Sequence, residues 1–62
     1  MTVVRYGGYK MEADKRGKVF QVTVYDLGNL RFPLMWSKTM TAEQAKGAID
    51  LFQTVGYYAM PI

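Results

Sequence analysis

Glu12 and Asp14 stand two positions apart and come closer than any other pair of acidic residues to forming a chemical site. In an extended strand, residues i and i+2 point to the same face, so the two carboxylates share one surface. A Mg²⁺ or Ca²⁺ ion needs more oxygen ligands than this pair supplies. We therefore interpret the pair as part of a solvated strand face and expect no metal site there.

The chain also lacks the residues from which most catalytic sites are built. It contains no histidine and no cysteine, so Ser37, its one serine, has no imidazole to accept its proton. Neither of the common phosphate-binding glycine motifs occurs in it. We predict that the protein is not an enzyme, uses no cofactor and acts by binding.

Size and composition predict one small domain over residues 1–62. Half of the 62 residues are hydrophobic and 15% are aromatic, which argues against disorder. Domains of this size often need disulfides, metals or a second subunit for stability, and the missing Cys and His leave association as the remaining route. A homodimer is therefore one expected arrangement. No apolar run approaches a membrane span and the first residues do not resemble a secretory signal, so we expect a cytoplasmic protein with no membrane partner.

Alternating apolar and polar residues predict a three-stranded antiparallel meander. Residues 2–14 form one bent strand or two short ones around Gly7-Gly8, and the next strands run from Lys18 to Asp26 and from Leu30 to Trp36. Pro33 cannot donate a hydrogen bond within a sheet, which predicts an edge position for the last strand. The inner face is expected to hold Phe20, Val22, Val24, Leu30, Phe32 and Leu34. The open face then holds Lys10, Glu12, Gln21, Thr23, Tyr25, Arg31, Pro33 and Met35.

One helix of about 15 residues is predicted after the strands. Thr41 and Gln44 have the spacing of a capping box, and Gly56 stands where a helix commonly ends. Apolar residues recur every three or four positions between these ends, at Ala45, Ala48, Ile49, Phe52 and Val55. The expected fold is α+β, with this C-terminal helix packed on one face of the sheet (β-β-β-α).

The leading hypothesis is a small accessory or inhibitory protein that binds another protein through its open sheet face. Stand-alone chains of this size often block or bridge a partner, as many phage or plasmid products do. Aromatic residues, Met and Arg are enriched at protein interfaces. The predicted contact residues are therefore Tyr25, Arg31, Met35 and Trp36, followed by Tyr57 and Tyr58.

Two other segments have apolar surface that the pattern leaves unassigned. Gln44, Gly47, Leu51 and Tyr58 follow one another along the flank of the helix, where Gly47 permits close approach of a partner or a second copy. The alternative is that Leu51 only widens the core face. The apolar segment 57–62 either completes the thin core or forms a docking segment.

The alternative function is nucleic-acid binding by the basic turn and the sheet. Gly17-Lys18-Val19-Phe20 resembles the start of the central strand in plant-type AP2 and phage-integrase arm-binding domains, and Thr41-Ala42-Glu43-Gln44-Ala45 resembles the opening of their helix. That resemblance implies DNA binding through a three-stranded sheet. The residues available for phosphate contacts are Arg5, Lys10, Lys15, Arg16, Lys18 and Arg31.

Overall fold

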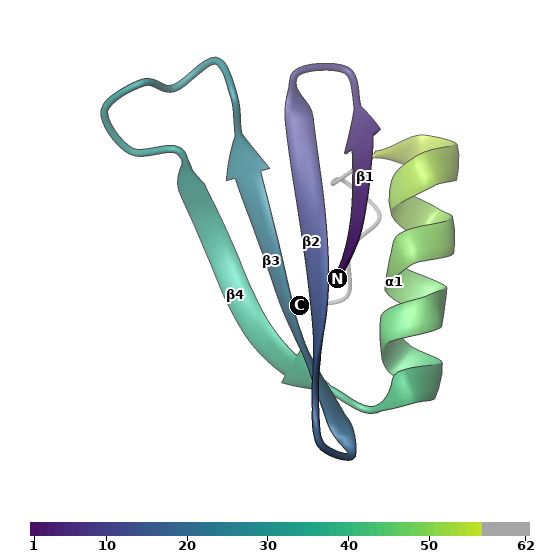
Figure 1. The fold of residues 1–62 in the computed structure, drawn as a ribbon. Coiled ribbons are helices and arrows are strands. Elements are labelled where there is room, and N and C mark those ends of the chain that lie inside the picture. The colour runs from purple at the N-terminus through teal and green to yellow at the C-terminus, as the bar shows by residue number, and fades with distance from the viewer. Residues whose placement is uncertain (57–62) are drawn as a thin grey trace.

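The structure is a computed structural model that describes residues 1–56. Four strands, β1 (Thr2–Tyr6), β2 (Tyr9–Arg16), β3 (Val19–Asp26) and β4 (Leu34–Met40), precede one helix, α1 (Ala42–Val55). The strands form a single antiparallel sheet in the order β1-β2-β3-β4, and α1 packs against one face of it (Figure 1). The α+β prediction is confirmed.

The sheet has four strands, so the prediction of three was wrong. Gly7-Gly8 is the turn of a hairpin in which Tyr6 pairs with Tyr9, and β1 folds back along β2. Gly7 has a φ of 58°, a left-handed conformation that glycine adopts without a steric penalty. The pair of glycines therefore separates two strands of the same sheet, where the sequence pattern allowed either one bent strand or two short ones.

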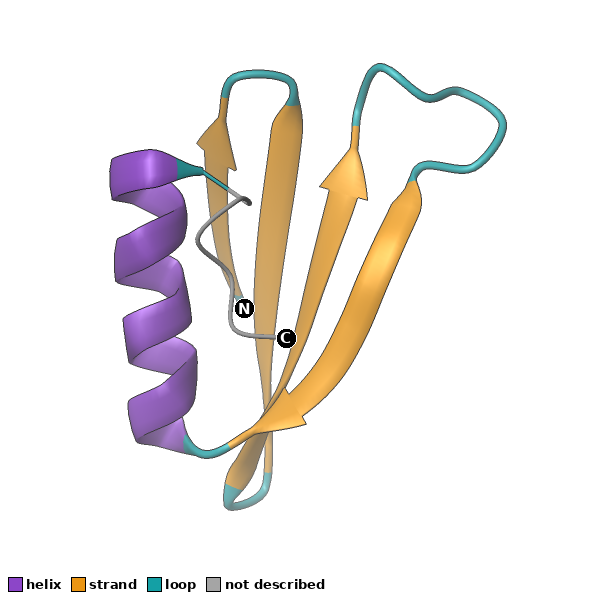
Figure 2. Cartoon of the chain, turned by 180° about the vertical axis from the view of Figure 1, so that it is seen from behind, coloured by secondary structure: helices purple, strands orange, loops and turns teal. Residues whose placement is uncertain are grey.

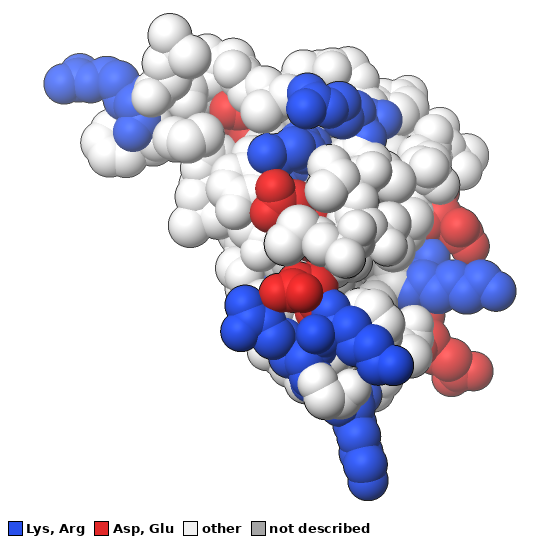
Figure 3. Space-filling view, viewed as in Figure 1, with Lys and Arg blue, Asp and Glu red and all other residues white. Residues whose placement is uncertain are grey.

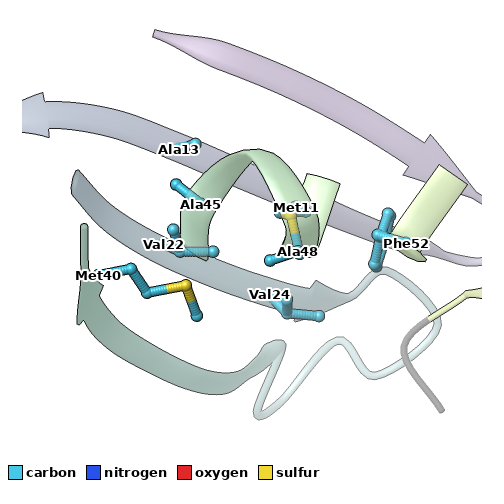
Figure 4. Packing of buried hydrophobic residues seen from close by; sticks show 8 residues of the cluster. All are labelled: Met11, Ala13, Val22, Val24, Met40, Ala45, Ala48 and Phe52. Carbon is cyan, nitrogen blue, oxygen red and sulfur yellow. The ribbon is translucent and has the colours of Figure 1, made fainter. Parts of the chain in front are cut away.

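The core lies between α1 and the face of the sheet that holds Met11, Val22 and Val24. Residues opposite one another in neighbouring strands share a face, and the register places Val4, Met11, Val24 and Trp36 in one row on this side. Val4 and Trp36 are half-buried at the two ends of that row. The helix adds three buried residues from its inner side, and the complete buried cluster is Met11, Ala13, Val22, Val24, Met40, Ala45, Ala48 and Phe52 (Figure 4).

The two ends of α1 lie where local hydrogen bonding predicts them. The Thr41 hydroxyl accepts the Gln44 backbone N–H at 3.2 Å, and the Gln44 side-chain oxygen accepts the Thr41 N–H at 3.1 Å. At the other end, the Gly56 N–H donates to the Phe52 carbonyl. Within residues 1–56, no helix has both the length and the apolar character needed to cross a bilayer.

Replacing Thr41 with alanine is expected to lower the free energy of unfolding by about 1 kcal/mol, because the Gln44 N–H then loses its acceptor. Urea denaturation followed by circular dichroism measures the change. Thr54→Ala is a suitable comparison, because the Thr54 hydroxyl donates to the Asp50 carbonyl within the helix and caps no free N–H. Equal effects of the two substitutions would contradict the capping role of Thr41.

The last strand begins four residues later than the pattern predicted. Residues 27–33 form a loop, and β4 runs from Leu34 to Met40. The expectation that Leu30, Phe32 and Leu34 lie in the core was wrong, since all three are exposed. Arg31 and Pro33 accordingly lie in the loop and not in a strand, although β4 is an edge strand as predicted. The physical reason is that alternation leads to burial only where other elements cover one face of the segment, and residues 27–34 are all exposed.

Candidate functional site: an exposed apolar loop beside the open sheet face

The loop between β3 and β4 exposes more apolar side chains than any other segment of residues 1–56. Leu30 is 92% exposed and Phe32 is 75% exposed, and Leu34 at the start of β4 is 57% exposed. Leu27 and Met35 are also partly exposed on either side of them. Contiguous apolar patches on small monomeric proteins commonly mark interaction sites.

Hydrogen bonds hold the backbone of this loop in one shape. The Asp26 N–H donates to the Pro33 carbonyl at 2.7 Å and closes the loop at its base. The Asp26 carboxylate accepts the Gly28 N–H at 3.0 Å, and the Asn29 side-chain oxygen accepts the Phe32 N–H at 3.0 Å. The side chains of Asp26 and Asn29 therefore bond within the loop, whereas Leu30, Arg31 and Phe32 are exposed. A loop ordered in advance loses less conformational entropy when it binds.

A β-bulge carries the loop residues onto the end of the open sheet face. Val24 pairs with Trp36 and Tyr25 pairs with Leu34, so Met35 is an extra residue between these two pairs. Leu34 therefore shares the open face with Tyr25, which is half-buried. The Lys10 ammonium lies 4.8 Å above the centre of the Tyr25 ring, where the negative face of the ring attracts the cation.

The predicted contact residues divide between three places. Tyr25 lies on the open face near the loop, Met35 is the bulge residue at the start of β4, and Arg31 lies in the loop itself. Trp36 lies on the helix face, where it is half-buried against the core. Tyr57 and Tyr58 lie outside the described residues, as does the rest of segment 57–62. The sequence interpretation did not include Leu30, Phe32 and Leu34 among the contact residues, because it placed them in the core. Pro33 could have indicated that the loop continues to that position.

The centre of the open face is a polar surface whose groups bind one another. Gln21 donates to the Ser37 hydroxyl at 2.6 Å and accepts from Thr39 at 3.1 Å. Thr23 lies 3.0 Å from the same Ser37 oxygen. The predicted open-face residues Lys10, Glu12, Gln21, Thr23 and Tyr25 do share this face, by the strand register. Because Gln21, Thr23, Ser37 and Thr39 bond one another, this region offers a partner few free hydrogen-bonding groups, whereas the loop offers apolar surface.

The acidic pair predicted to share a face does so, and each carboxylate has its own cation. Glu12 lies 3.1 Å from the Lys10 ammonium, and Asp14 accepts a hydrogen bond of 2.8 Å from Arg16. Among the described residues, no group of three or more acidic side chains could hold a metal ion. The pair fits the interpretation as a solvated strand face.

The six basic residues of the nucleic-acid alternative do not form one continuous surface. Along β2, one face carries Lys10, Glu12, Asp14 and Arg16, so two carboxylates separate the basic ends. Arg5 of β1 pairs with Lys10. Lys18 lies in the β2–β3 turn with Lys15 near it, and Arg31 lies in the loop at the opposite end of β3. Figure 3 shows basic side chains towards both ends of the face in view, with acidic ones between them.

A shallow groove of about 210 Å³ lies on the other side of the sheet, between α1 and β4. Lys38 and Met40 line it from the strand, and the helix contributes Gln44, Gly47, Ala48 and Leu51. Three of these residues belong to the helix flank that the sequence singled out. The strand and the helix meet at Thr41 and diverge from there (Figure 2). Gly47 leaves open space, with no other group within 4 Å of the position of a Cβ, and Leu51 is 43% exposed.

The chain matches no protein-family model, no curated protein sequence and no solved structure.

Proposed function

We propose that this chain is a small protein-binding module that uses the β3–β4 loop as its contact surface. The observation that carries the proposal is the exposure of Leu30, Phe32 and Leu34 on a loop with hydrogen-bonded ends. Large apolar side chains on the surface of a small domain lower its solubility. A protein partner that buries them removes apolar surface from water, which contributes favourable binding free energy.

The surroundings of the loop also favour a protein as the partner. Arg31 projects from the loop, and Tyr25 and Met35 lie beside it on the sheet. Aromatic residues, Met and Arg are the side chains enriched in the buried centres of protein interfaces. The polar residues of the open face would then form the rim around an apolar centre.

Nucleic acid is the competing partner class. The two groups of basic residues are separated by Glu12 and Asp14, which would face the phosphates if the whole sheet lay on a duplex. A surface that neutralises several phosphates loses affinity steeply as salt concentration rises. Binding of random duplex DNA with that salt dependence would favour the basic β2–β3 turn over the apolar loop.

The proposal is tested by photo-crosslinking in cells that produce the protein. A benzophenone amino acid replaces Phe32, and in a matched control it replaces Lys46, which is exposed on α1 away from the loop. Position 32 is expected to give discrete covalent adducts with protein, and position 46 is expected to give none of them. A Leu30→Ser substitution in the same chain should weaken the adducts, because it removes a neighbouring contact.

The same adduct pattern at both positions, or no adduct at position 32, would contradict the proposal. Either result would show that the loop is not the surface that binds a protein partner.

A further inference from the structure

The end of the open face beside the β3–β4 loop carries a row of residues that crosses the whole sheet. Residues opposite one another on neighbouring strands share a face, and the register gives one row member from each strand, in the order Arg5, Lys10, Tyr25 and Leu34. The row therefore runs from two cations through an aromatic ring to an aliphatic side chain. The exposed apolar residues of the loop continue it at the Leu34 end.

The two connections at this end of the sheet are joined to each other. The Leu27 N–H, at the start of the β3–β4 loop, donates to the Gly8 carbonyl in the β1–β2 turn at 2.8 Å. Figure 1 shows both connections at the same end of the sheet. The basic end of the row, on β1 and β2, and its apolar end, on β4 and the loop, therefore belong to one connected surface.

The charges of this surface are only partly neutralised within the described residues. Arg5 and Arg31 are exposed, and neither forms an ion pair within residues 1–56. Lys10 has one carboxylate, that of Glu12, at 3.1 Å. Like charges directly opposite each other destabilise a strand pair, and Arg5 lies directly opposite Lys10. A carboxylate bound beside these two cations would relieve that repulsion.

We propose that the partner of the loop is an acidic, apolar segment of another protein that lies across the strands at this end of the open face. Its carboxylates contact Arg5, Lys10 and Arg31, and its large apolar side chains pack against Leu34 and Phe32. This inference rests on the proposed function, for which it names the chemistry of the partner.

The spacing between strands indicates how the partner segment must be arranged. Neighbouring strands lie about 4.8 Å apart, so Lys10 on β2 and Leu34 on β4 are separated by about 10 Å. An extended segment rises about 3.3 Å per residue, so it covers that distance in about three residues. We therefore expect an acidic residue and a large apolar residue about three positions apart in the segment that binds.

A protein segment fits this surface better than nucleic acid or a lipid bilayer does. Glu12 stands next to the row on the same face of β2 and would repel the phosphates of a duplex. The row extends over three strand spacings, about 14 Å, from Leu34 to Arg5. A chain lying across it contacts both ends, whereas insertion of the loop into a membrane would use only the apolar end.

The test begins with random dodecapeptides displayed on phage and selected on the immobilised full chain. Enriched peptides are expected to combine Asp or Glu with Leu, Phe or Trp about three positions away. The strongest binder is then synthesised with a fluorescent label, and its Kd is measured by fluorescence anisotropy. Replacing its acidic residues with the corresponding amides should raise the Kd about tenfold or more.

Charge reversal in the protein assigns the contact to the cations. Arg5→Glu and Arg31→Glu are each expected to raise the Kd about tenfold. Lys46→Glu is the matched control, because it makes the same change of charge on the exposed side of α1, and it should change the Kd less than about twofold. Circular dichroism establishes that the variants keep the fold.

Two further measurements separate direct contact from a structural role. A peptide with Lys in place of its acidic residues should bind Arg31→Glu more tightly than the original peptide does, because the opposite charges are restored. A purely structural role of Arg31 would give no such rescue. Phe32→Ser should also raise the Kd for the original peptide, because it removes the apolar contact.

The outcomes separate the two proposals. A selection that yields no binder, binders without acidic residues, or an unchanged Kd after amide replacement overturns the inference, and protein adducts from position 32 would still uphold the proposed function. Tighter binding of random duplex DNA or of phosphatidylserine vesicles through Arg5 and Arg31 would also overturn it, in favour of a phosphate ligand. Failure of both the peptide selection and the position-32 adducts removes both proposals.

Discussion

Replacing Phe52 with alanine is expected to lower the free energy of unfolding by about 3–5 kcal/mol. Phe52 is completely buried, and its ring meets the edge of Tyr6 with 6.5 Å between the ring centres. At about 0.05–0.15 kcal/mol per residue, a chain of 62 residues has a total stability of about 3–9 kcal/mol. The substitution therefore removes between about a third and all of the stability, and the unfolded fraction at room temperature should rise accordingly.

Urea denaturation at fixed protein concentration, followed by circular dichroism, measures this loss. Val55→Ala is the matched control, because Val55 lies in the last turn of the same helix but is 45% exposed. It should cost about 0.5 kcal/mol or less. Similar denaturation midpoints for the two variants would show that Phe52 is not the centre of the core.

The second large effect is expected from Gly56→Ala, with a loss of about 2–3 kcal/mol. Gly56 has φ 80° and ψ −170°, a region that is essentially restricted to glycine. A Cβ at this position would lie 2.7 Å from Cδ1 of Tyr6, far inside van der Waals contact. The alanine must therefore strain the backbone and displace the ring that packs on Phe52.

Gly47→Ala is the comparison that isolates this effect, since it makes the same chemical change in a different environment. Gly47 lies inside α1 with no other group within 4 Å of its Cβ position. Alanine should raise stability there by up to about 1 kcal/mol, because it has the higher helix propensity. The same thermal or urea melts measure both variants. Two changes of the same sign would contradict the role assigned to Gly56.

These stability effects and the binding proposals depend on different parts of the molecule. Phe52, Tyr6 and Gly56 lie where α1 ends against β1, whereas the loop and β4 form the opposite side of the sheet. Variants of Leu30 or Phe32 change exposed side chains and should leave the unfolding free energy within about 0.5 kcal/mol of its original value. A loss of binding in those variants can therefore be assigned to the contact surface.

Edge strands of sheets are prone to pair with other chains unless something blocks them. In β4, the bulge at Met35 and the charge of Lys38 limit unspecific pairing.

The amino-acid sequence by itself determined the elements whose signals act over a few residues. Thr41, Gln44 and Gly56 define the helix ends through hydrogen bonds within one turn, so the predicted bounds of α1 agree with the structure. The alternation from Lys18 to Asp26 likewise placed Val22 and Val24 in the core. Both are local rules, in which the neighbours that matter are close in sequence.

Only the tertiary structure decided where residues 27–40, the loop and β4, lie. Leu30, Phe32 and Leu34 alternate as a strand would, but their burial depends on which strand lies beside them and in which register. The hydrogen bond from Asp26 to Pro33 closes a loop, and the bulge at Met35 sets the register of β4. The groove likewise exists only because β4 and α1, joined at Thr41, diverge in space. Pairing across a sheet and packing between layers involve residues distant in sequence, and local periodicity carries no information about them.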